Sequence, residues 1–136
     1  MGRNFRSIKA WQLADDLVIA IYDATATFPA EERYGLISQI RRAAVSTAAN
    51  IAEGATRHSH KEYVQFLSIA KGSLAEVEYY LHLSQRLGYL TETQHRQLTE
   101  VQGQCGKTLH GLFKAVRNDR EAEVVVVGSS DLGLES

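Results

Sequence analysis

Four cationic side chains lie where the sequence could bring them to a phosphate group. Arg41 and Arg42 are neighbours in a segment with helical periodicity, and Arg57 and Lys61 flank Ser59, which has the sequence context of a helix N-cap. The first N–H groups of a helix and its positive dipole end favour anions, and nearby cations strengthen that preference. Arg41, Arg42, Arg57 and Lys61 are therefore the candidate nucleic-acid-binding residues of the chain.

A structural role is the alternative for the same cations. Arg41 and Arg42 lie off the apolar seam of their segment, where they can be solvated or can pair with a carboxylate such as Glu31, Glu32 or Glu53. The residues around Ser59 fit an ordinary loop equally well. A third group of cations near the start of the chain would add to polyanion binding only if all the groups share one surface; it consists of Arg3, Arg6 and Lys9.

Metal and nucleophile chemistry finds little support in the sequence. A di-iron site in a helical bundle needs two Glu-x-x-His pairs, and the chain offers one, Glu92 with His95. Cys105 is the only cysteine and lies on an apolar stripe, which predicts a buried, unreactive thiol. Phosphate-binding glycine loops and nucleophile elbows are absent. We therefore expect no catalytic residue, no metal and no cofactor, and we expect that the protein is not an enzyme.

The distribution of charge along the chain is uneven. Residues 1–118 contain 14 lysines and arginines against 11 aspartates and glutamates, whereas residues 119–136 contain one arginine against five acids. The body is mildly basic and the tail acidic, and the total formal charge is −1. This basic excess is far weaker than that of a dedicated DNA-binding domain.

Apolar residues recur at alternating spacings of three and four in four successive segments, which is the pattern of amphipathic helices. The first segment predicts a helix from Ile8 to Phe28 with Ser7 as its N-cap, because Pro29 cannot continue a helix. The second segment carries its stripe from Ile37 to Ile51. Gly54 follows where a helix C-terminus prefers glycine.

The third and fourth segments each open with a capping box. These are Ser59 with Glu62 and Thr91 with Gln94. Gly88 ends the third segment, and the connections throughout are only a few residues long. Sequential antiparallel packing follows, so the sequence predicts an all-α, up-down-up-down four-helix bundle over residues 1–118.

Residues 119–136 break the helical pattern. Four consecutive valines from Val124 to Val127 favour β structure, and the segment from Gly128 to Asp131 has the composition of a loop. Two interpretations follow: a mobile extension, or a valine run that docks in a groove of its own or a neighbouring subunit.

Small and apolar residues exceed what a lone bundle needs. Alanines occupy more than one face of the second segment, and the third segment is apolar well beyond one seam; the residues that widen it are Phe66, Ile69, Tyr80, Leu83 and Leu87. We predict subunit contact for part of this surface. The alternative is that the alanines only line a tight monomer core. The N-terminus lacks the apolar run of a signal peptide and no stretch is long enough to span a bilayer, so we expect a cytoplasmic protein without membrane contact.

Several motifs resemble one known family. They are Trp11-Gln12, Phe28-Pro29-x-Glu31-Glu32-x-Tyr34-Gly35-Leu36, Ser38-Gln39-Ile40-Arg41-Arg42-Ala43-Ala44, Asn50-Ile51-Ala52-Glu53-Gly54 and Ser59-x-Lys61-Glu62-Tyr63. Over residues 5–117 the chain resembles the four-helix-bundle proteins encoded in 23S rRNA intervening sequences, also called S23 ribosomal proteins. The resemblance implies a bacterial bundle that assembles into a homo-oligomeric ring, a pentamer. It also implies kinship with the nucleic-acid-binding accessory variability protein of diversity-generating retroelements, which is more basic than this chain.

Two functions remain open at this level. The first is a non-enzymatic oligomeric bundle whose ring presents basic residues to RNA or DNA. The second is a protein-interaction scaffold without a nucleic-acid role, in which the arginines pair with acidic groups and the partner is another protein. A continuous positive surface favours the first function, and arginines held against acids favour the second.

Overall fold

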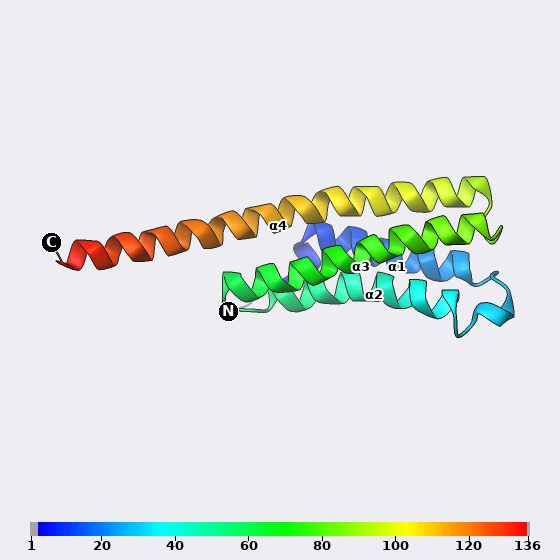
Figure 1. Cartoon of the computed structure of the whole chain (residues 1–136), viewed down its shortest axis with the longest axis horizontal. Coiled ribbons are helices and arrows are strands. Elements are labelled where there is room, and N and C mark those ends of the chain that lie inside the picture. The colour runs from blue at the N-terminus through cyan, green and yellow to red at the C-terminus, as the bar shows by residue number, and fades with distance from the viewer. Residues whose placement is uncertain (1–2, 136) are drawn as a thin grey trace.

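Four α-helices form the chain, and the computed structural model describes their backbone over residues 3–135 and their side chains over residues 3–120. The helices are α1 (Lys9–Thr25), α2 (Leu36–Ala55), α3 (His60–Arg86) and α4 (Glu92–Glu135). Single 3-10 turns, η1 (Phe5–Ser7) and η2 (Ala30–Glu32), precede α1 and α2. Every regular element in this range is helical. Figure 1 shows successive helices running in opposite directions side by side, which confirms the predicted antiparallel bundle.

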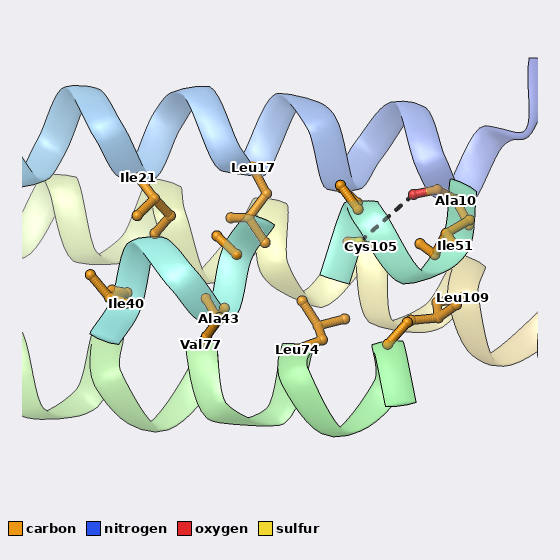
Figure 2. Packing of buried hydrophobic residues seen from close by; sticks show 14 of the residues in the cluster. Ala10, Leu17, Ile21, Ile40, Ala43, Ile51, Leu74, Val77, Cys105 and Leu109 are labelled. Atoms are coloured by element: carbon orange, nitrogen blue, oxygen red, sulfur yellow. Dashed lines mark hydrogen bonds between the residues drawn. The ribbon is translucent and has the colours of Figure 1, made fainter. Parts of the chain in front are cut away.

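One continuous core fills the space between the four helices, and the predicted stripes face it. Leu17 and Ile21 of α1 and Ile40 of α2 are completely buried, and Cys105 of α4 lies among them. Figure 2 shows these side chains, together with Leu74 and Val77 of α3, converging from all four helices. The Cys105 thiol donates to the Ala10 carbonyl across the core at 4.0 Å. This confirms the expectation of a buried core cysteine.

Both predicted capping boxes begin helices. The Ser59 hydroxyl accepts the Glu62 N–H at 3.0 Å and starts α3. At the start of α4, the Thr91 hydroxyl accepts the Gln94 N–H at 3.1 Å and the Gln94 side chain accepts the Thr91 N–H at 2.9 Å. Gly88 has a φ of 77°, a left-handed conformation that ends α3 and turns the chain toward α4.

The predicted bounds of the first helix were wrong at both ends. Ser7 is part of η1 and does not cap α1; Ile8 precedes that helix without a side-chain cap. At the other end α1 stops at Thr25, three residues before Phe28, and the Phe28 N–H donates to the Thr25 carbonyl at 3.1 Å. Phe28 is buried beside the ring of Tyr89, at a centroid distance of 5.3 Å. Its apolar character therefore reflects packing against the α3–α4 connection.

Gly54 is not a terminating glycine, which corrects a second expectation. It lies inside α2, is buried, and has no left-handed conformation. A Cβ atom added there would come within 2.8 Å of the Phe66 Cβ and 3.0 Å of the Tyr63 ring. Glycine is required because α3 approaches α2 this closely.

The tail continues α4 as a helix to Glu135, so the expected break at residue 119 was wrong. Figure 1 shows this part of α4 extending past the ends of the other three helices. Valine is tolerated in a helix at a cost of a few tenths of a kcal/mol per residue, and the segment contains no proline to stop propagation. The side chains of residues 121–136 lie outside the described residues, and with them the predicted docking of the valine run.

Candidate nucleic-acid interface

Arg41 is tied to the C-terminus of α1. Its Nε donates to the Thr25 hydroxyl at 2.8 Å and its Nη2 donates to the Tyr22 carbonyl at 3.4 Å. The guanidinium also lies 4.4 Å from the centre of the Tyr22 ring. The last carbonyls of a helix lack intrahelical donors and carry partial negative charge, so a cation is stabilising there. Arg41 caps one helix from the next and is only partly available to a ligand.

Arg42 is the more accessible of the two adjacent arginines. It is exposed on α2, and its Nη2 donates to the side chain of Gln39 at 2.6 Å. A small hollow between α2 and α3 is lined by Arg42 together with Ser73 and Glu76. The Ser46 and Ser73 hydroxyls hydrogen-bond at 2.8 Å in the same hollow. Arg42 therefore borders the outer seam between these two helices.

Arg57 is held within its own subunit. Its Nη2 pairs with the Glu53 carboxylate at 2.6 Å, and its guanidinium lies 4.8 Å from the centre of the Phe66 ring. The Nε atom is buried without a hydrogen-bond acceptor. Both side chains of the ion pair keep considerable solvent exposure, so the pair contributes little to stability. The outer edge of the guanidinium remains accessible.

Lys61 lies in the first turn of α3 and is exposed. Its neighbourhood is less suited to an anion than the sequence suggested, because the Ser59 hydroxyl already accepts the N–H of Glu62 and the Glu62 carboxylate occupies the same turn. His58 and His60 also have interactions of their own. Any phosphate here would be bound by side-chain charge more than by free N–H groups.

The four candidates divide into two pairs at opposite ends of α2. Arg41 and Arg57 are separated by 16 positions, which corresponds to about 24 Å of helix. The N-terminal segment joins the second pair: the Arg3 N–H donates to the Ala55 carbonyl at 2.9 Å, and its Nη1 donates to the Arg57 carbonyl at 3.4 Å. The end of the bundle formed by the N-terminal segment and the α2–α3 connection thus gathers cations of two sequence groups. We call it the amino-terminal end.

One cationic group escaped the sequence prediction. Lys71 of α3 contacts His110 and Phe113 of α4. Arg117 lies over the same Phe113 ring, and the charges of Lys114 and Arg117 act on His110. The α4 spacing of three and four was visible in the sequence. The participation of Lys71 depends on the register between α3 and α4, which the sequence alone does not give. We call this group the α3–α4 cation cluster.

The groups that suggested other chemistry do not assemble. Burial raises the pKa of the Cys105 thiol to about 11, so the nucleophilic thiolate is scarce at neutral pH. Within the described residues, no group of three or more histidine, cysteine, aspartate or glutamate side chains is arranged to hold a metal ion. Among the described helices, none combines the length and the apolarity needed to cross a membrane.

A second seam runs along the outer side of α3. Residues at alternating spacings of three and four follow it, offset by one position from the core seam: Phe66, Ile69, Ser73, Glu76, Tyr80, Leu83 and Leu87. Ile69 is 53% exposed and Leu87 is 48% exposed. Val45 of α2 lies 41% exposed on the outer face of its helix. Tyr80 and Leu83 are partly buried against the core, Phe66 packs against Arg57, and Ser73 is buried. The exposed apolar side chains on this side of α2 and α3 are therefore Val45, Ile69 and Leu87.

Comparison with known proteins agrees with the fold. A family model described as 23S rRNA-intervening sequence protein matches residues 6–111. The chain is also similar to a 1.70 Å crystal structure of a protein with unknown function from the S23 ribosomal protein family of Bacteroides thetaiotaomicron. That similarity has a TM-score of 0.71 at 24% identity and covers 77% of this chain and 95% of the other, so it shows the fold. None of the curated proteins matches the sequence.

Proposed function

The chain belongs to the family of 23S rRNA-intervening sequence proteins, and from that premise we propose that it is a non-catalytic, self-associating helical bundle that binds RNA or DNA through exposed cations. The observation that carries this proposal is the gathering of cations at the amino-terminal end, where Arg3 contacts Arg57 and Lys61 follows. Where cations concentrate on one surface, polyanion binding is the simplest use.

The outer seam of α3 supports self-association. A helix buried on one seam by its own bundle normally exposes polar residues elsewhere, whereas α3 also exposes Ile69 and Leu87 to about half of their surface. Burial of such a seam against a second copy removes apolar area from water at about 25 cal/mol per Å². We propose a closed homo-oligomeric ring. The proposed number of five subunits follows from the family resemblance.

Ring assembly would strengthen nucleic-acid binding by repetition. A single subunit carries a modest basic excess in residues 1–118, and a ring repeats each cationic group around a common axis. Arg42, Arg57 and Lys61 are the proposed phosphate contacts at the level of side chains. Arg41 is assigned a structural role instead, because its N–H groups already donate to Thr25 and Tyr22 of α1.

The scaffold function keeps one specific observation in its favour. Arg57 pairs with Glu53, and Arg41 bonds to Thr25 and Tyr22, so two of the four candidate cations are bound inside the subunit. A protein partner would then occupy the apolar outer seam of α3. The two functions differ in salt dependence, because release of counterions from phosphates makes nucleic-acid binding fall steeply with salt.

The test combines assembly with binding. Light scattering of the purified protein at several concentrations should give the mass of several chains. An electrophoretic shift with structured RNA should weaken strongly as salt rises. The variant Arg42→Glu/Lys61→Glu should abolish the shift, and Arg86→Glu/Arg96→Glu, with the same charge change at two cations that are not proposed contacts, should retain it. A shift that does not weaken with salt, or that is unchanged in both variants, would favour the scaffold function.

A further inference from the structure

The α3–α4 cation cluster has a defined geometry. The Nζ of Lys71 lies 3.1 Å from Nδ1 of His110 and 4.2 Å from the centre of the Phe113 ring. The Arg117 guanidinium lies 5.4 Å from the centre of the same ring. The His110 and Phe113 rings are nearly parallel, with an interplanar angle of 18° and a centroid distance of 6.4 Å. The ring of Phe113 thus makes cation–π contacts with two cations that come from different helices.

Positive charge in this cluster is not compensated within the subunit. Among the residues that the structure describes, the ion pair made by a lysine or arginine is Arg57 with Glu53, at the amino-terminal end. The pKa of His110 is lowered, chiefly by the charge of Lys71. Desolvation and the charges of Lys114 and Arg117 lower it further. Like charges gathered without a counter-ion oppose one another, and an external anion relieves that cost.

The positions along α4 fit an extended anion. His110, Lys114 and Arg117 follow one another by about one turn each and span about 10 Å of helix. Lys71 adds a cation from α3, beside His110. A single phosphate reaches only part of such a row, whereas consecutive phosphates of a nucleic-acid strand can contact all of it. Lys71 lies over one face of Phe113 and competes there with base stacking, so what the cluster mainly offers is charge to a backbone.

We propose that the α3–α4 cation cluster, formed by Lys71, His110, Lys114 and Arg117, binds the sugar–phosphate backbone of a nucleic acid without reading its sequence. This inference rests on the proposed nucleic-acid function and adds a second surface to the contacts proposed above. Lys114 and Arg117 lie beyond residues 6–111, so this surface extends past the range that matches the family. It lies on α3 and α4, away from the outer seam proposed for self-association.

Binding of a nucleic acid to this surface should be coupled to protonation of His110. Lys71 from α3 and Lys114 and Arg117 from α4 surround His110, and Lys107 lies one turn before it on the same helix. In the free protein these cations favour neutral imidazole, which accepts from the Lys71 ammonium. Bound phosphates would reverse the local field and favour imidazolium, so binding should tighten as the pH falls from about 7.5 toward about 5.5.

Two charge-matched double variants test the assignment. Lys71→Gln/Lys114→Gln removes two cations from the cluster, and Arg86→Gln/Arg96→Gln removes two cations from the far part of the same helices. Each is titrated against a fluorescein-labelled RNA of about 20 nucleotides of mixed sequence, by anisotropy, between about 50 and 300 mM KCl. The cluster variant should lose roughly tenfold or more in affinity and should lower the salt slope by about 2. The control variant should stay within about twofold of the native protein.

The outcomes separate this inference from the proposed function. If the native protein binds and the two variants lose affinity equally, or the cluster variant loses none, the cluster assignment is wrong and the proposed function stands. If the native protein binds no RNA or DNA at low salt, both fail. If unlabelled polyglutamate competed as well as unlabelled RNA, the ligand of the cluster would be any polyanion and not a nucleic acid in particular. Thermal melts of each protein separate a loss of binding from a loss of fold. An Arg117→Gln variant, which removes a third cation of the cluster, should also weaken binding.

A spectroscopic measurement provides a second reading. The His110 ring should titrate below the usual histidine range in the free protein, and addition of the same RNA should raise its pKa in NMR spectra. An unchanged His110 titration in the presence of saturating RNA would overturn the assignment even if RNA binds elsewhere.

Discussion

The Nε of Arg41 donates to the hydroxyl of Thr25 at 2.8 Å, and this bond links the first half of α2 to the last residue of α1. Thr25 is buried and donates onward to the Ile21 carbonyl at 2.7 Å. The sequence presented Arg41 as a candidate phosphate ligand. Its contacts make it a structural residue first, because hydrogen bonds from a charged donor to a helix end are among the stronger polar contributions to stability.

Arg41→Gln should therefore destabilise the bundle by about 1–2 kcal/mol, since a cation and two hydrogen bonds at the end of α1 are lost. Arg42→Gln is the matched control and should change the free energy of unfolding by less than about 0.5 kcal/mol, because the bond from Arg42 to Gln39 is exposed to solvent. Chemical denaturation followed by circular dichroism measures both. Equal midpoints for the two variants would contradict the capping role.

Gly54→Ala should destabilise the protein by about 1–3 kcal/mol, although alanine is the better helix former. The added methyl group would overlap the Phe66 Cβ and press on the Tyr63 ring. Gly111→Ala on α4 serves as control, because a Cβ there meets nothing within 4 Å. That variant should raise stability by up to about 1 kcal/mol. Thermal melts that move in the same direction for both would show that helix propensity outweighs packing at residue 54.

Cys105 should resist alkylation by iodoacetamide in the native protein at pH 8 and react promptly after unfolding, because burial and a pKa of about 11 keep the thiol protonated. The same shift predicts a loss of stability at alkaline pH. Between the ordinary thiol pKa and about 11 the unfolded chain releases this proton and the folded chain retains it, so stability falls as pH rises. Cys105→Ala should remove that part of the pH dependence. Rapid alkylation of the native protein would contradict the buried position.

Truncation after Arg120 should tighten binding to RNA. The removed residues carry four acids and no lysine or arginine, so the formal charge of the chain rises from −1 to +3. Long-range attraction to a polyanion increases with that change, most clearly at low salt. The melting temperature should stay within a few degrees, because among the side chains described, up to residue 120, Val116 is the last one of α4 in the core. Weaker binding after truncation, measured by anisotropy, would contradict this prediction and would mean that the tail itself contributes to RNA binding.

Local rules predicted most of the fold. The three-four spacing identified all four helices, and the capping boxes at Ser59 and Thr91 fixed two of their starts to within one residue. These features depend on residues close in sequence, for which the physical chemistry is local. The bundle topology followed from short connections. The family assignment came from motif residues and is confirmed by the match over residues 6–111.

Features that depend on register between helices could not be predicted in the same way. Arg41 meets Thr25, and Lys71 meets His110, across positions far apart in the chain. The need for Gly54 arises from the approach of α3, which a propensity rule mistakes for a helix end. The valine tail failed for the opposite reason: its local preference is for β structure, yet an established helix propagates one residue at a time at small cost.

The two seams of α3, one toward the core and one outward, have a consequence for how this protein would unfold. In the proposed ring, α3 would pack against the core of its own subunit and against a second subunit, so it could not unfold in one without exposing the other. Loss of the monomer fold and dissociation of the ring would then be a single transition governed by mass action, and dilution alone would lower the melting temperature.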